Sequence, residues 1–160
     1  MKRIKNVVRK DLDSCDLGNQ AQGKNLTQKI RSVVFQHIYE NALCKNIYID
    51  CVGGYNDHVH CLFRIRNDQV VNEVLRLLKG ESSRWINKTN LTRGKFEWQK
   101  EYLALSVSES QIDRVRMYIR NQETHHGGKS SADEYAQFIR RLGLRVKGLS
   151  HSPSIQKTQH

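Results

Sequence analysis

Two histidines stand one residue apart in the stretch NDHVHCLFRI, residues 56–65. The apolar residues around them predict a strand, in which alternate side chains point to opposite faces. One face is apolar and consists of Val59, Cys61, Phe63 and Ile65. His58 and His60 share the other face with Leu62 and Arg64, at backbone positions roughly 7 Å apart. Two imidazoles at this spacing can bind one metal ion, although such a pair is also typical of structural or surface histidines.

A second set of reactive side chains lies in SESQIDRVRMYIRNQETHH, residues 108–126. Ser108 and Gln111 fit a capping box at a helix start, and Tyr118 and Gln122 then share one face of that helix. A glutamine oxygen can complete a divalent site begun by two imidazoles. A tyrosine can attack an electrophile that such a metal polarises. The set describes an Mg²⁺ or Mn²⁺ site for phosphodiester chemistry, whereas the spacing alone also fits a packed tyrosine and a solvated amide.

The sequence before and after the histidine strand indicates the elements that would position it. Hydrophobic periodicity predicts a helix over about 27–45 and a strand over 46–52. Residues 53–57 begin with two glycines and predict a loop that leads into the histidine strand. A second amphipathic helix follows, with Asn67 or Asp68 as its predicted cap.

The second half of the chain completes an α+β pattern. A strand is predicted at about 102–107, then the tyrosine helix, then a short amphipathic helix over 132–144. This order predicts an antiparallel sheet with helices packed on one face and the other face open. We expect a divergent N-terminal segment at 1–25, one domain at 26–146 and a polar, disordered tail at 147–160.

The composition favours a polyanionic partner. Lys and Arg number 27 against 16 Asp and Glu, a formal charge of +11 over 160 residues, which points to nucleic acid first and an anionic membrane surface second. No apolar run reaches membrane-spanning length, and the basic start leads into polar residues, so we expect no membrane insertion and a cytoplasmic location. Four cysteines without a C-x-x-C pair predict buried free thiols rather than a zinc site or disulfides.

Several stretches together resemble one known family. They are GGYNDHVHCLFRI, LLKGESSRWIN, KFEWQKEYLALSVSESQIDRVRMYIRNQETHH and DEYAQFIRRLGL, in order over roughly 27–145. They resemble the single-tyrosine transposases of small insertion sequences, the IS200-like family of the HUH superfamily. The resemblance implies an RRM-like or ferredoxin-like antiparallel sheet with helices packed on one face. It also implies that His58, His60 and Gln122 are metal ligands and that Tyr118 is the nucleophile.

The resemblance further implies an activity and partners. Members of the family use Mg²⁺ or Mn²⁺ to nick and rejoin single-stranded DNA at mobile-element ends through a 5′-phosphotyrosine. They bind hairpins of the folded single strand and work as homodimers, often with the tyrosine helix of one subunit completing the other's site. The residues that we expect to contact DNA are Lys79, Arg84, Lys88, Arg114, Arg116 and Arg120. Each of these positions is equally compatible with a merely solvated charge.

The chain departs from the family at its start. Residues 1–25 lack the usual opening strand with a His-x-hydrophobic pattern followed by Thr-Lys-x-Arg, so the sheet lacks that strand or forms it from a different sequence. Glu101 and Leu103 also stand where glycine is common. A degenerate or domesticated member that binds structured nucleic acid without cleavage is therefore an alternative. A neighbouring HUH enzyme, which mobilises genomic repeats or starts rolling-circle replication, is a third.

Overall fold

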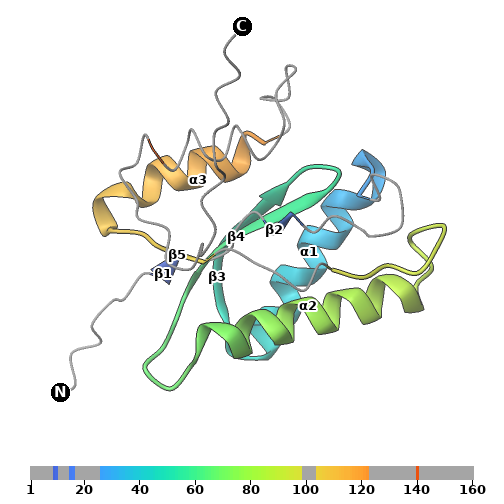
Figure 1. The fold of residues 1–160 in the computed structure, drawn as a ribbon, viewed down its shortest axis with the longest axis horizontal. Coiled ribbons are helices and arrows are strands. Elements are labelled where there is room, and N and C mark those ends of the chain that lie inside the picture. Colours follow the sequence, from blue (N-terminus) through green and yellow to red (C-terminus); the bar gives the residue numbers. More distant parts are fainter. Residues whose placement is uncertain (1–8, 11–14, 17–25, 99–103, 123–139, 141–160) are drawn as a thin grey trace, which may run out of the picture.

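The computed structural model describes residues 9–10, 15–16, 26–98, 104–122 and 140. Within these ranges, helices pack on both sides of a small antiparallel sheet (Figure 1). The longer elements are α1 (Gln28–Cys44), β3 (Tyr48–Gly54), β4 (His58–Arg64), α2 (Val71–Lys88) and α3 (Ile112–Arg120). Shorter ones are β1 (Arg9–Lys10), β2 (Cys15–Asp16), β5 (Leu105–Ser106) and a 3₁₀ turn at Glu109–Gln111.

The histidine strand β4 lies in the middle of a sheet with the order β2-β4-β3. All its pairings are antiparallel: β3 places Gly53 opposite His60, and β2 places Asp16 opposite His58. Strand β1 pairs separately with β5. The first 25 residues thus contribute two short strands despite their unfamiliar sequence, and one of them flanks the histidines.

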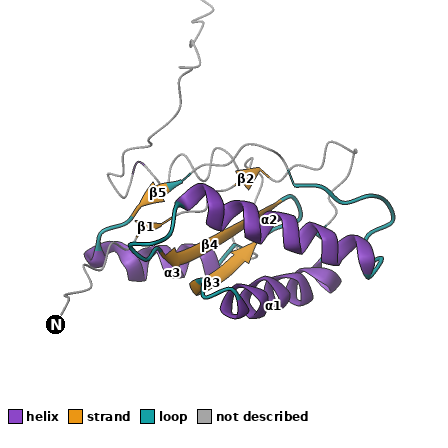
Figure 2. Cartoon of the chain, turned by 90° about the horizontal axis from the view of Figure 1, so that it is seen from below, coloured by secondary structure: helices purple, strands orange, loops and turns teal. Residues whose placement is uncertain are grey.

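The larger hydrophobic core lies between one face of the sheet and the helices α1 and α2. Val59, Cys61 and Phe63 face this core from β4, as the alternation predicts. Figure 2 shows α1 and α2 side by side in one layer. Their buried contributions include Val34, Ile38, Val74, Leu75, Leu78 and Ile86. Burial of these aliphatic side chains supplies most of the stabilising apolar surface of the described fold.

The other face of the sheet is covered by α3. A second apolar cluster consists of Cys51, Leu62, Val107, Val115 and Ile119. The α+β class and the antiparallel sheet are confirmed, but the expected open face needs correction. The reason is a register irregularity between Ile49 and Cys51, which brings Cys51 opposite Leu62 and gives α3 an apolar surface to cover.

Two predicted boundaries also differ from the structure. Gly53 and Gly54 belong to β3 and pair with β4 instead of opening a loop. The helix α2 begins after Val70, not at a cap at residues 67–68, because the Asp68 carboxylate accepts hydrogen bonds from Arg66 at 2.8 and 3.0 Å. The predicted capping box at Ser108 is not formed either, although a helix does follow it.

Other expectations meet the structure only in part. Cys51 and Cys61 are buried free thiols as predicted, while Cys44 is a free thiol at the surface. No helix in the described ranges is long and apolar enough to cross a membrane. The predicted helix over 132–144, except Arg140, and the tail at 147–160 fall outside the described residues. The domain boundaries at 26 and 146 stay predictions.

Candidate active site

Both histidines of β4 are buried beneath α3. His58 and His60 are each only 2% exposed, and their ring centres lie 4.9 Å apart. The sequence placed them outside the core, because strand alternation separates them from the apolar face that includes Val59 and Phe63. The covering helix explains the difference, and it also shields the two rings from bulk water.

A chain of hydrogen-bonding groups fixes the orientation of His58. Its Nδ1 lies 2.8 Å from Oδ1 of Asp57, and its Nε2 lies 2.9 Å from Oε1 of Gln122. The Gln122 amide nitrogen donates to the backbone carbonyl of Tyr118 at 3.2 Å, so the amide oxygen is the atom that faces His58. A carboxylate can only accept, so Nδ1 carries the proton that it donates to Asp57.

This arrangement suits a cation. With the proton on Nδ1, the Nε2 lone pair of His58 points at the Oε1 lone pair of Gln122, and the contact needs a cation or a second ring proton. An octahedral ion with ligands at about 2.1 Å separates adjacent ligand atoms by about 3.0 Å, close to the observed 2.9 Å. The Asp57–His58 pair matches the carboxylate support that metal-binding histidines usually have. The donor set therefore fits a divalent ion.

The amide is essential to this fit. Among the described residues, no group of three His, Cys, Asp or Glu side chains could hold a metal ion. Two imidazoles and one neutral amide would leave open coordination positions for phosphate oxygens. Such a set relies on Gln122, which is buried with 2% exposure in the turn just after α3.

Tyr118 lies beside the same group within the same chain. Its ring centre is 5.5 Å from that of His60, at an interplanar angle of 57°. Tyr118 is half-buried and belongs to the fringe of the cluster that attaches α3. The structure thus brings together all four residues that the sequence selected for chemistry, two from β4 and two from α3 and the turn after it, at least 58 positions apart in the chain.

A close helix–strand contact positions the tyrosine. A Cβ atom on Gly53 would lie 2.2 Å from the backbone oxygen of Ile119 and 2.9 Å from its Cγ2. Only glycine at this position lets α3 lie directly on β3, one residue past Tyr118. A Cβ on Gly54 would lie 2.1 Å from the backbone oxygen of His58, so the second glycine keeps the hairpin close to the first histidine.

An ion pair attaches α3 to the same strand. The Arg116 guanidinium donates to both oxygens of Asp50, at 2.8 and 2.5 Å, and to Asp113 at 2.7 Å. Hydrogen bonding from Arg116 lowers the pKa of Asp50 below its ordinary value, although burial opposes it. Arg116, predicted to contact DNA, is therefore already engaged within the chain, two residues before the candidate nucleophile.

The buried Arg31 supports the turn before the histidines. It is 4% exposed, donates to the side-chain oxygen of Asn56 at 2.5 Å and lies 4.8 Å from the Tyr55 ring centre. This turn ends at Asp57, which contacts His58. Neither Arg31 nor Asp57 was selected from the sequence. Adjacency to the first histidine was the available signal for Asp57, but a buried arginine in a helix gives none.

The other basic candidates fall into two groups. Lys79, Arg84 and Lys88 belong to α2, on the core side of the sheet, where Lys79 is half-buried and the other two are exposed. Arg114 and Arg120 are exposed on α3, which carries Tyr118. The sheet separates the two groups, so one short DNA segment at the active site would reach only those on α3.

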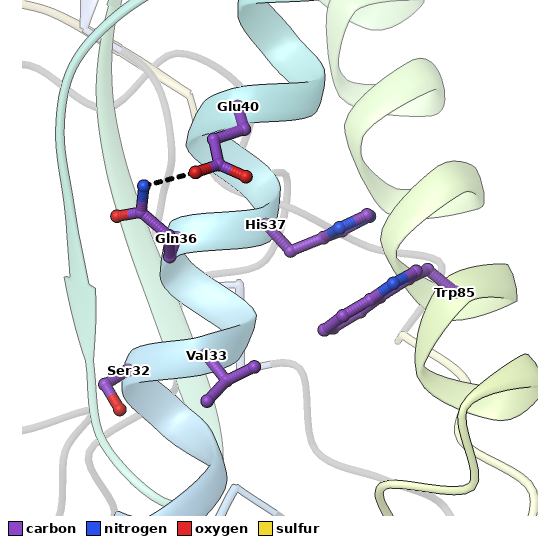
Figure 3. A pocket seen from close by; sticks show the side chains of 6 residues that line it. All are labelled: Ser32, Val33, Gln36, His37, Glu40 and Trp85. Carbon is purple, nitrogen blue, oxygen red and sulfur yellow. Dashed lines mark hydrogen bonds between the residues drawn. The ribbon is translucent and has the colours of Figure 1, made fainter.

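A hollow of about 350 Å³ lies away from this site, between α1 and α2 (Figure 3). His37 stacks on Trp85 there, with ring centres 3.8 Å apart, and its Nε2 lies 2.9 Å from the Glu81 carboxylate. Ser32, Val33, Gln36 and Glu40 complete the lining. The hollow is on the helical layer opposite α3 and contributes nothing to the histidine–tyrosine group.

Comparison with known proteins identifies the family. The model of the family "Transposase IS200 like" matches residues 19–122, which is well over half of the chain, so this chain belongs to the IS200-like transposases. Membership confirms the resemblance. It supports a role for the chain in transposition, with DNA as its partner. A crystal structure of a proposed transposase from Deinococcus radiodurans R1 is similar, with a TM-score of 0.49 and 20% identity over 76% of this chain and 98% of the other. No curated protein sequence matches the chain.

Proposed function

We propose that this chain is a metal-dependent transposase that nicks and rejoins single-stranded DNA at mobile-element ends. Tyr118 would be the nucleophile, and a 5′-phosphotyrosine would join the chain to DNA between the two steps. The observation that carries the proposal is the 5.5 Å separation of the Tyr118 and His60 rings, in a chain of the IS200-like family.

His58, His60 and Gln122 would hold the metal. The support for this assignment is the 2.9 Å contact between His58 Nε2 and Gln122 Oε1, together with the Asp57 carboxylate on Nδ1. A bound Mg²⁺ or Mn²⁺ would stabilise the negative charge that develops on the attacked phosphate. The burial of both histidines would strengthen electrostatic interactions at the site.

The covalent step exchanges one bond between phosphorus and oxygen for another. The Tyr118 oxygen bonds to phosphorus as its proton leaves, and the bond from phosphorus to the 3′ oxygen breaks. That oxygen takes up a proton and departs as a 3′-hydroxyl. A 3′-hydroxyl can later attack the phosphotyrosine and regenerate the phenol, so rejoining needs no nucleotide cofactor. The role of α3 is to hold the phenol near the phosphorus during both cleavage and rejoining.

The partners follow from the same proposal. Hairpins of the folded single strand would bind to basic surface, for which Lys79, Arg84, Lys88, Arg114 and Arg120 stay our candidates. A homodimer stays a prediction as well. Because α3 packs on the histidine strand of its own chain, one subunit already brings Tyr118 beside the imidazole pair.

An adduct assay tests the proposal. Single-stranded element ends incubated with the chain and Mg²⁺ or Mn²⁺ should give a covalent protein–DNA band that survives denaturation. Tyr118→Phe should give none, because the phenol oxygen is the bond-forming atom. Hairpin binding without any adduct, under each divalent metal tried, would favour the alternative in which the chain binds structured nucleic acid and does not cut it.

A further inference from the structure

The face of β4 that carries the histidines continues to an exposed end. Arg64 lies on this face, four residues past His60, and pairs across the ladder with Tyr48 of β3. The Arg64 guanidinium carbon is 5.1 Å from the centre of the Tyr48 ring. Tyr48 is 51% exposed, so a large aromatic ring is held in a fixed orientation but left open to solvent.

The α3 helix brings one guanidinium group, that of Arg116, into contact with this end of the sheet. Arg116 and Arg120 are one turn apart on the helix, and Arg116 binds Asp50, two residues after Tyr48. The positive charges of Arg120 and Arg64 help to lower the pKa of Asp50, after the larger effect of Arg116.

The balance of charge at this end of the sheet is positive. The Asp50 carboxylate is bound by Arg116, which also binds Asp113. Within the described part of the chain, Arg64 and Arg120 form no ion pair. The Arg64 guanidinium beside the exposed ring, and that of Arg120, which is near enough to Asp50 to affect its pKa, therefore remain available to an anionic ligand.

We propose that Tyr48, Arg64 and Arg120 bind a single-stranded DNA segment that leads into the active site. This inference rests on the proposed function and names the path of its substrate. An exposed ring stacks on any base, while adjacent guanidinium groups bind phosphates, which is the combination that single strands require. A base paired within a duplex cannot present its face to Tyr48.

The distance to the chemistry suits a short strand. Four residues of β4 separate Arg64 from His60, about 13 Å along the strand. At about 3.4 Å per stacked nucleotide, this span corresponds to about four nucleotides. A strand whose phosphate is attacked by Tyr118 could therefore span the distance to Tyr48.

The first test replaces the ring. In a Tyr118→Phe background, which cannot form the covalent link, Tyr48→Ser should weaken binding of a mixed-sequence single-stranded oligonucleotide at least about fivefold. Tyr48→Phe should bind within about twofold of the background, because the stacking face is kept. The matched control is Tyr39→Ser, which removes a 42% exposed tyrosine from α1 and should leave affinity unchanged. Fluorescence anisotropy without divalent metal measures all four proteins.

The second test removes a charge. Arg64→Gln should lower the slope of log affinity against log salt concentration by about 0.7, the value for one phosphate contact on a single strand. Arg93→Gln, an exposed arginine in the segment after α2, removes the same charge and should leave the slope unchanged. Unaltered thermal unfolding of each variant shows that the surface, not the fold, has changed.

Three results would overturn the inference. The first is equal single-strand affinity for Tyr48→Ser and Tyr39→Ser, and the second is an unchanged salt slope for Arg64→Gln. The third is a loss of affinity of Tyr48→Ser for a blunt duplex of the same length that equals its loss for the single strand. The proposed function fails separately, on the adduct assay. If the unaltered chain forms the adduct and the Tyr48 variants bind DNA normally, only the strand path is overturned. If Tyr48→Ser loses binding and the unaltered chain forms no adduct, the strand path is supported and the cleavage is rejected.

Discussion

Alanine in place of Gly53 should push the tyrosine helix off the sheet. The added Cβ would lie 2.2 Å from the backbone oxygen of Ile119, and ordinary contacts begin at 3.4 Å. Because this oxygen belongs to the helix backbone, no side-chain rotation relieves the overlap, and α3 must move by about 1 Å. Tyr118 precedes Ile119 and moves with it. A misplacement of about 1 Å can lower a rate about 10²-fold, which is the loss that we expect.

Single-turnover adduct formation measures this loss. Gly53→Ala and the unaltered chain would be mixed with single-stranded element ends and Mg²⁺ or Mn²⁺, and the covalent product followed with time. Saturating DNA isolates the bond-forming step from binding. The matched control is Gly80→Ala in α2, where an added Cβ meets no atom within 4 Å. It should leave the rate unchanged and stabilise the fold by up to about 1 kcal/mol.

The outcome that refutes this reasoning is specific. If folded Gly53→Ala forms the adduct at the rate of the unaltered chain, close contact between β3 and α3 does not position Tyr118. Thermal unfolding and circular dichroism establish the folded state. A lower rate accompanied by an equal loss of DNA affinity would also count against it, because the displaced phenol should affect bond formation alone.

Three further predictions concern neighbouring groups. Asp57→Asn should weaken Mn²⁺ binding, measured directly by electron paramagnetic resonance, about 10- to 100-fold, as expected for a lost carboxylate support. The lowered pKa of Asp50 implies that its pair with Arg116 stabilises the fold above about pH 4 and that this contribution fades as the pH falls through the folded-state pKa. Thermal unfolding of Asp50→Asn should lack this pH dependence. Burial raises the pKa of Cys51 to about 11, so a thiol reagent at neutral pH should modify exposed Cys44 and spare Cys51 in peptide mass spectrometry.

The composition of the site could be predicted because it depends on local periodicity. Strand alternation alone puts His58 and His60 on one face, and the helical repeat alone puts Tyr118 and Gln122 on another. The histidines occupy these relative positions in the structure. The helix α3 ends at Arg120, and Gln122 in the turn after it still donates to the backbone oxygen of Tyr118. The helix over 27–45 was predictable for the same reason, since α1 covers Gln28–Cys44.

The approach of the two pairs could not be predicted in the same way. It depends on which face α3 covers, and this depends on the register irregularity that turns Cys51 toward Leu62. It also depends on a backbone contact at Gly53, whose signal in the sequence is a glycine that reads equally well as a loop residue. Both features are long-range consequences of pairing and packing, which no window of neighbouring residues contains.

The site lies between two apolar clusters of unequal size, and this has a consequence for substrate binding. Among the described residues, the cluster that attaches α3 has five buried members, against fourteen in the core beneath α1 and α2. Within this part of the chain, the helix that carries Tyr118 has the smaller apolar attachment. A DNA strand that contacts Arg64 on the sheet and Arg120 on the helix would bridge both parts. Because a ligand stabilises the state to which it binds, such a strand would strengthen the attachment of α3 in proportion to its affinity. Binding of the substrate would then hold the phenol and the imidazoles together during the reaction.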